Sequence, residues 1–217
     1  MTGYKKIWIV ALVASCASIL AGGCATTPNS RFYTISPVAK TAPVAVAKPL
    51  AGALVLGIGP VAIPDYLDRP QIVVRSARNE LVLNEFSRWA GSLQNDTARV
   101  LRENLEAMLA GDGISVTSWR RGIPNAYRVA VDISRFESTD YGVVTLKAQW
   151  IIFGGEGSKM LMVRDSSIRE EFFGGGIESV VTAMGKALEA LGLEIAQGVR
   201  DVRSRVTGNG AEKPEQG

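Results

Sequence analysis

Segments of alternating apolar and polar residues recur along the second half of the chain and predict a β-sheet. Between Tyr127 and Phe136, for example, Val129, Val131 and Ile133 alternate with other residues, which is typical of a strand with one buried face. Short turn segments separate neighbouring strands, so several pairs are predicted to form hairpins. The predicted strands are 31–36, 54–58 with an extension at 61–63 past a bulge, 71–76, 80–86, 114–118, 127–136, 143–153 and 159–169.

Two other segments have the apolar spacing of helices. In 94–110, with Asn95 or Asp96 as the N-cap and Gly111 and Gly113 at the end, the stripe consists of Thr97, Leu101, Leu105 and Met108. The second helix carries Val181, Met184, Leu188, Leu191 and Ile195 and extends to Val199 and Val202. This order of elements predicts a single α/β domain, with a mixed, mostly antiparallel sheet and two main helices packed on it.

The first residues have the layout of a secretory signal peptide. Lys5 and Lys6 precede an apolar run, and small residues then lead directly into Cys24. This pattern resembles the lipobox of bacterial lipoproteins, in which the chain is cut before the cysteine. The expected modification of Cys24 is an S-diacylglycerol group and an N-acyl chain, and no other cofactor is expected. Such a multi-chain lipid anchor holds a protein at a membrane without a transmembrane helix.

Two alternatives to this N-terminus stay open. The uncharged segment 7–30 can act as an uncleaved anchor, although Gly22, Gly23 and Pro28 make its second half a poor helix. A second lipobox-like run ends at Cys16, but it leaves a very short apolar core. The residue after Cys24 is Ala25 rather than aspartate, and resemblance to enteric lipoproteins then implies sorting to the outer membrane, on its periplasmic face.

Composition shifts divide the chain into four parts. Proline and alanine are frequent from Ala25 to Gly52, where prolines prevent a long helix. The predicted parts are a lipoprotein signal peptide at 1–23, a lipidated N-terminus and tether at 24–52 with an edge strand at 31–36, an α/β domain at 53–205, and a disordered tail at 206–217.

Composition also excludes several kinds of chemistry. The chain has no histidine, and both of its cysteines lie in the first 24 residues, so histidine-dependent catalysis and cysteine-ligated metal sites are not available to the domain. The net charge is +3, or +1 without Lys5 and Lys6. This balance gives no reason to expect a nucleic-acid partner. We therefore expect no catalytic residue, no metal and no enzymatic activity.

Two glycine motifs and two carboxylate pairs have a structural and a functional interpretation. Gly57-Ile58-Gly59 follows a strand, but Pro60 comes next and no helix begins there, so a dinucleotide site is rejected. The run 174–176 of three glycines precedes the last helix and indicates a flexible joint more than an anion site. The carboxylate pairs Asp65/Asp68 and Glu170/Glu171 have no accompanying nucleophile or metal set, so solvated surface acids are expected.

The segment from Pro60 to Pro70 is stiff, because three prolines fix its backbone. A local ion pair between Asp68 and Arg69 is expected to help hold it. Tyr66, Leu67 and Trp89 form either a packing cluster or a contact surface, since aromatic side chains are also frequent in interfaces. The candidate partner-binding residues are Pro64, Asp65, Tyr66, Leu67, Asp68, Arg69, Pro70, Gln71 and Trp89.

These segments also carry a resemblance. The run from Pro60 to Val73, the sequence Glu85-Phe86-Ser87-Arg88-Trp89, the segment 95–109 and the early Phe32-Tyr33-Thr34-Ile35-Ser36-Pro37 resemble the ABC-type transport auxiliary lipoprotein family, which includes the paraquat-inducible protein C lipoproteins. The likeness extends from about Cys24 to Ile195, while the long tether and the glycine-rich hairpin near Gly154 depart from the family. The resemblance implies a fold similar to the N-terminal domain of TolB.

It further implies a periplasmic, outer-membrane lipoprotein that serves an intermembrane lipid transport system. Its expected partners are an MCE-domain protein and, through it, an ABC permease and an ATPase, and a homo-oligomer is also compatible with this role. The leading hypothesis is a non-enzymatic docking subunit. The alternatives are a lipid-binding carrier that holds an acyl chain on the concave face of the sheet, and an envelope hydrolase acting through Asp65, Asp68 or Glu170.

Overall fold

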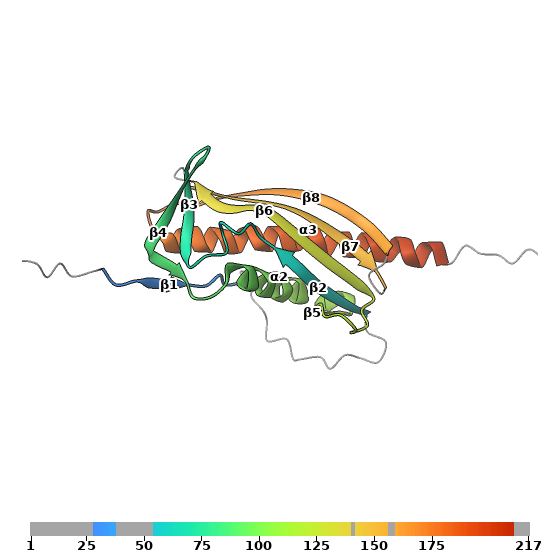
Figure 1. Ribbon diagram of the computed structural model, residues 1–217. Helices are drawn as coiled ribbons and strands as arrows, with labels where there is room; N and C mark the ends of the chain where they lie inside the picture. Colours follow the sequence, from blue (N-terminus) through green and yellow to red (C-terminus); the bar gives the residue numbers. More distant parts are fainter. Residues whose placement is uncertain (1–27, 38–53, 140–141, 156–158, 211–217) are drawn as a thin grey trace, which may run out of the picture.

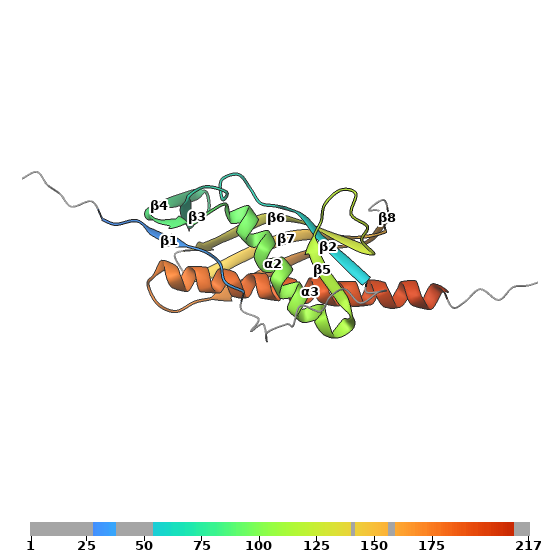
Figure 2. The same ribbon diagram turned by 90° about the horizontal axis from the view of Figure 1, so that it is seen from below.

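Both helices lie on one face of a single mixed sheet, so the molecule has two layers (Figures 1 and 2). The computed structural model describes residues 28–37, 54–139, 142–155 and 159–210. Cys16, Cys24, the predicted signal peptide, most of the tether and residues 211–217 lie outside these ranges. The predicted fold class, one α/β domain with two helices on a mixed sheet, is confirmed.

The strand β6 (Tyr127–Thr139) is the centre of the sheet. On one side, β6 pairs antiparallel with β7 (Val143–Gly154), and β7 in turn pairs antiparallel with β8 (Lys159–Glu171). On the other side, β2 (Leu54–Ala62) runs parallel to the first half of β6, and β3 (Gln71–Ala77) runs parallel to its end. Sharing one side of β6 in this way splits the sheet into two branches.

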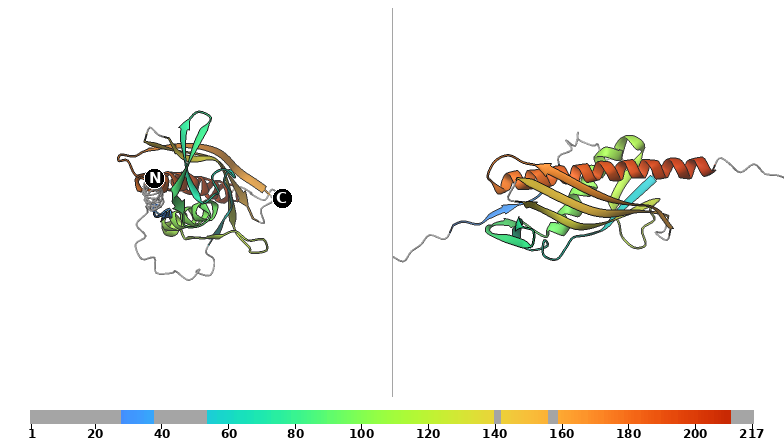
Figure 3. Two further views of the ribbon diagram at one scale, coloured as in Figure 1. Left: turned by 60° about the vertical axis from the view of Figure 1, so that its left-hand side comes forward. Right: turned by 90° about the horizontal axis from the view of Figure 1, so that it is seen from above.

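Each branch ends in a short strand. The first branch continues from β2 to the parallel strand β5 (Ile114–Ser118). The second continues from β3 through the hairpin partner β4 (Glu80–Trp89) to β1 (Arg31–Tyr33), which pairs parallel with the last residues of β4. The β3–β4 hairpin projects from the rest of the sheet in the end-on view of Figure 3.

The strands differ from their predicted bounds mainly in length. The segment predicted at 31–36 is a strand only at Arg31–Tyr33, and the two predicted pieces at 54–58 and 61–63 are one strand. The register of β2 against β6 shifts between Ile58 and Val61, where the sequence predicts a bulge. The strand at 114–118 has the predicted bounds, and those predicted at 71–76 and 143–153 are longer by one residue. The strands β4, β6 and β8 continue two or three residues beyond the predicted ends, because backbone pairing persists where polar side chains begin.

The first described helix, α2, spans Leu93–Leu109. Its N-cap is Ser92, whose hydroxyl accepts a hydrogen bond from the Asn95 amide, so the predicted cap at Asn95 or Asp96 is wrong. The buried residues include Thr97, Leu101 and Leu105 as expected, whereas Met108 is only partly buried. A turn of 3-10 helix, η1 (Ala110–Asp112), follows, and Gly113 ends it with a φ of 68°.

The second helix, α3, spans Ile177–Gly210 and runs along the whole length of the sheet (Figure 3). It continues to Gly210, so the predicted disordered tail is wrong for residues 206–210, where the backbone is helical. Its apolar stripe is buried against the sheet and α2, which explains why the helix is long and regular. Within the described residues, neither α2 nor α3 contains an apolar stretch of the length that a transmembrane span requires.

Large side chains fill the space between the sheet and the helices. Trp150, Phe136 and Leu146 are almost completely buried there. The indole N–H of Trp150 donates a hydrogen bond of 2.8 Å to the Ser166 hydroxyl, which fixes the ring. Gly198 of α3 packs directly against this ring, because a Cβ atom at residue 198 would lie 2.7 Å from it. The interior of the molecule is therefore a packed core.

Candidate functional site

The loop between β2 and β3 is held by its own backbone. The amide of Leu67 donates to the Pro64 carbonyl at 2.9 Å, and the amide of Arg69 donates to the Leu67 carbonyl at 2.9 Å. The Trp89 amide, at the end of β4, donates to the Pro70 carbonyl at 2.7 Å. The stiff loop that the prolines predict is thus also tied to β4.

The apolar side chains of this loop and of the adjoining end of β4 point inward. Leu67 is 2% exposed and Trp89 is 5% exposed, and both belong to the main core. Tyr66 is partly buried against the same core. Of the two interpretations of these three residues, their burial therefore favours the packing cluster.

Tyr66 also belongs to a polar cluster around Glu137, whose side chain is fully buried. The Tyr66 hydroxyl donates to Glu137 Oε2 at 2.9 Å, while Arg75 Nε and Arg135 Nε donate to Oε1 at 2.7 and 2.9 Å. Burial, followed by the charge of Glu137, raises the pKa of Tyr66, and the hydrogen bond to Glu137 raises the pKa of Arg75. Two guanidinium groups and a phenol thus compensate the buried carboxylate.

This cluster was not predicted from the sequence. Glu137 directly follows the predicted strand 127–136, and Arg135 precedes it by two residues. A signal was present in the chain: an acid directly after a strand with one buried face, with an arginine two positions before it, needs a compensating partner if the strand continues and buries it. The cluster joins the 64–71 loop and β3 to β6.

The expected ion pair between Asp68 and Arg69 is not among the salt bridges of the described residues. Asp68 instead accepts hydrogen bonds from the Ser92 hydroxyl at 3.0 Å and the Gln94 amide at 3.3 Å, so it holds the start of α2. A carboxylate at a helix N-terminus interacts favourably with the free amides and the helix dipole, which explains this choice of partner. The 64–71 loop is therefore coupled to the helix as well as to the sheet.

The remaining members of the predicted partner-binding set differ in exposure. Asp65, Asp68 and Pro70 are exposed, whereas Pro64, Arg69 and Gln71 are partly buried. The Gln71 side chain donates to Glu85 on β4 at 3.4 Å. Within the 64–71 loop, only the outer edge, formed by the exposed residues Asp65, Asp68 and Pro70, is thus accessible to another molecule.

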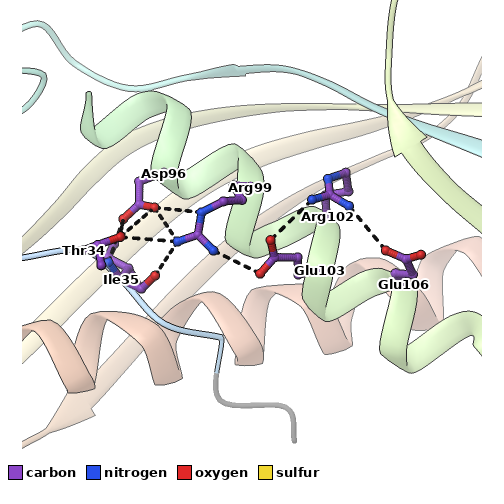
Figure 4. A network of polar contacts seen from close by, with 7 residues as sticks. All are labelled: Thr34, Ile35, Asp96, Arg99, Arg102, Glu103 and Glu106. Carbon is purple, nitrogen blue, oxygen red and sulfur yellow. Dashed lines mark hydrogen bonds and ion pairs between the residues drawn. The ribbon is translucent and has the colours of Figure 1, made fainter. Parts of the chain in front are cut away.

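A second polar cluster fixes the N-terminal segment to α2 (Figure 4). Asp96 accepts hydrogen bonds from the Thr34 hydroxyl at 3.0 Å and from the Ile35 amide at 2.6 Å. Arg99 donates to the Ile35 carbonyl at 2.6 Å and pairs with both Asp96 and Glu103. The Ile35 side chain is completely buried. We call Thr34, Ile35, Asp96 and Arg99 the anchor junction.

The anchor junction was not predicted from the sequence either. Asp96 was expected as a helix cap, but its carboxylate binds backbone and side chain about sixty positions earlier in the chain. The pattern of an acid in the first helical turn with Arg99 three residues later was visible, but its partner was not. Because Cys24 lies seven residues before Arg31, the junction fixes the segment that the predicted lipid anchor would hold.

The other motifs have structural explanations. Glu170 and Glu171 are adjacent in β8 and so point to opposite faces of the sheet, which separates the proposed carboxylate pair. Gly57, Ile58 and Gly59 lie inside β2, where a helix N-terminus for a pyrophosphate is missing. Across the described residues, no group of three or more His, Cys, Asp or Glu side chains is placed to hold a metal ion.

Solved structures support the fold at low sequence identity. A protein described as uncharacterized matches with a TM-score of 0.66 and 18% identity, covering 79% of this chain and 99% of its own. Protein XCC0632 from Xanthomonas campestris, of the DUF330 family, matches with a TM-score of 0.65 and 18% identity, covering 82% and 99%. Among curated proteins no relative matches.

The family comparison covers most of the chain. Residues 33–196 match the family described as the ABC-type transport auxiliary lipoprotein component, and this range includes β1's last residue, both polar clusters and most of α3. The resemblance suggested by the 60–73 run is confirmed. The chain therefore belongs to the ABC-type transport auxiliary lipoprotein family.

Proposed function

We propose that this lipoprotein is a non-enzymatic subunit of an intermembrane lipid transport system, held at the periplasmic face of the outer membrane through lipid on Cys24. There it docks an MCE-domain protein, and through it an ABC permease and an ATPase. Membership of the auxiliary lipoprotein family supports a role beside an ABC transporter. The outer-membrane location rests on Ala25 after the cysteine.

The anchor junction is the observation that carries this proposal. Seven residues after Cys24 the chain enters β1, and Asp96 and Arg99 then hold the backbone of Ile35. A force applied through the lipid would therefore reach α2 directly rather than an unattached linker. Such a connection suits a subunit that keeps a partner at a fixed place on the membrane.

The packed interior favours docking over the carrier alternative. A carrier needs an apolar cavity that holds an acyl chain, whereas Trp150, Phe136 and Leu146 occupy the space between the sheet and the helices. Native mass spectrometry of the purified mature protein tests this point. A docking subunit is expected to carry only its covalent lipid, and an additional stoichiometric lipid would support the carrier.

The lipid anchor has its own test. Labelled palmitate is expected to enter the wild-type protein in cells and not a Cys24→Ser variant, and the MCE-domain protein is expected to co-purify with the wild type in the membrane fraction. Normal transport with Cys24→Ser would contradict the anchored role.

The exposed edge of the 64–71 loop is the proposed contact for the MCE-domain protein. A photo-crosslinking residue at Asp65, which is exposed, is expected to capture this partner in cells. The matched control is the same residue at Gln197, an exposed position on α3. Equal capture at both positions, or none at Asp65 when the two proteins still co-purify, would remove the loop from the interface but not the family role.

A further inference from the structure

Two exposed phenylalanines lie at the end of the molecule where the N-terminal segment enters. Phe32 of β1 is 64% exposed, and Phe173, in the loop between β8 and α3, is 90% exposed. Figures 1 and 2 place β1 and the start of α3 at the same end of the molecule. Exposed aromatic side chains are costly in water, so a pair of them at one end needs an explanation.

The two side chains border neighbouring hollows. Phe32 lines one hollow and Phe173 lines the next, and both hollows include Glu178 and Thr182 on the first turns of α3. Phe32 and Phe173 therefore border one continuous part of the surface over the first turns of α3, which we call the aromatic end. They are not isolated residues scattered over the molecule.

The loop that carries Phe173 presents this side chain outward. Three glycines follow it, and Gly174 has a φ of 104°, which a residue with a side chain rarely adopts. With 90% of its surface exposed, Phe173 gives the core almost no buried area. Its aromatic ring is thus available for a contact outside the folded chain.

Chain length identifies that contact. An extended chain covers about 3.3–3.6 Å per residue, so the seven steps from Cys24 to Arg31 span at most roughly 25 Å. The helix α3 has 34 residues and is roughly 50 Å long. Lipid on Cys24 would therefore hold the aromatic end close to the bilayer, whereas the opposite end of α3 can lie much farther from it.

The charges nearby fit the headgroup region of a membrane. Arg31 is exposed next to Phe32, and Lys186 lines the hollow that includes Phe173. Glu171 and Glu178 lie in the same area, so the net charge is balanced. A mixed surface of this kind suits insertion of aromatic rings among headgroups better than attraction to strongly anionic lipid.

We propose that Phe32 and Phe173 insert into the headgroup region of the membrane that holds the lipid anchor, and so orient the protein with the far end of α3 away from the bilayer. This inference rests on the lipid anchor of the proposed function. It adds a direct contact between the folded domain and the membrane, and it assigns the aromatic end to lipid rather than to a protein partner.

Spin labelling of the full lipidated protein tests the contact. The mature protein has no free thiol if Cys16 is removed and Cys24 is acylated, so a nitroxide on Phe173→Cys has a single position. The protein is placed in vesicles of phosphatidylethanolamine and phosphatidylglycerol. The matched control is Met160→Cys, which is 63% exposed at the other end of β8.

At position 173 we expect the label to collide readily with oxygen and several-fold less with a water-soluble nickel complex than the label at 160. Equal accessibility to the nickel complex at both positions would overturn the proposal. Spin–spin broadening at 173 that grows with protein density would also overturn it, since a second copy would then cover this end. A failure of the anchor is distinguishable, because the protein would not float with the vesicles.

Discussion

At the scale of single residues, the carboxylate of Glu137 is fully buried and therefore needs hydrogen-bond partners that compensate its charge. It receives charge-assisted hydrogen bonds from Arg75 and Arg135 and a further bond from Tyr66. Burial of a charge is tolerated only with such partners, and these three come from three different segments. The cluster can therefore form only when the 64–71 loop, β3 and β6 are correctly assembled.

Tyr66 gives this cluster a dependence on alkaline pH. Its pKa is raised above the ordinary value near 10, first by burial and then by Glu137, so the neutral phenol is favoured in the folded state. This contribution to stability is complete below pH 10 and is lost as the pH rises from there towards the folded-state pKa.

We expect Tyr66→Phe to lower the free energy of unfolding by about 1 kcal/mol at neutral pH, because the hydrogen bond to Glu137 is lost. The difference between wild type and variant should shrink above pH 10. Urea unfolding at a series of pH values measures both effects. A difference that grows with alkaline pH would show that the phenol is not held neutral by the fold.

At the scale of elements, α3 depends on glycine where it crosses the sheet. A Cβ atom at Gly198 would lie 2.7 and 2.9 Å from two atoms of the Trp150 ring, and the indole is held by its bond to Ser166. At Gly192 the same addition would meet Asn104 and Met108 at 3.5 Å, an ordinary contact distance. Substitution of the two glycines therefore distinguishes the effect of close packing, at Gly198, from the effect of helix propensity alone, at Gly192.

We expect Gly198→Ala to destabilise the protein by about 1–3 kcal/mol, since overpacking outweighs the gain in helix propensity. Gly192→Ala is the matched control and should be neutral or stabilising by up to about 1 kcal/mol. Thermal or urea unfolding of both variants gives the comparison. Equal effects at the two positions would mean that the Trp150 ring moves aside without cost.

The elements themselves were largely predictable from the sequence, because apolar periodicity records which faces are buried. Val129, Val131 and Ile133 alternate in the sequence and are all buried in β6. The cap of α2 was not predictable in this way, since Asp96 looks like a capping residue but binds Ile35 from a distant segment. Local pattern cannot identify a partner that only the tertiary fold brings near.

The candidate site was predicted less well for the same reason. The stiffness of the 64–71 loop follows from its prolines, but the inward direction of Leu67 depends on the position of the core beneath it. Likewise, Asp68 accepts a hydrogen bond from the Gln94 amide instead of pairing with its neighbour Arg69, because the fold places the start of α2 beside it. Sequence therefore indicated where the special loop lies and left open which of its faces is exposed.

At the scale of the whole molecule, the N-terminal segment belongs to the folded domain rather than only to a tether. The composition placed the start of the domain at residue 53, but Ile35 is completely buried and β1 extends the sheet beyond β4. The anchor junction adds hydrogen bonds to Asp96 and Arg99. The lipid-proximal chain thus supplies both core surface and a sheet edge.

A protein that begins at residue 28 is therefore expected to be more stable than one that begins at residue 54. The difference should exceed the effect of Ile35→Ala in the longer protein, which removes a fully buried side chain and is expected to cost about 2–4 kcal/mol. Arg31→Ala, at an exposed side chain, is the control and should have little effect. Urea unfolding of the four proteins makes the comparison. Equal unfolding midpoints for the proteins that begin at residues 28 and 54 would mean that segment 28–37 is a linker that does not stabilise the domain. If the shorter protein is less stable as expected, a force on the lipid anchor would act on the core. The segment can detach only by exposing Ile35 and breaking its hydrogen bond to Asp96.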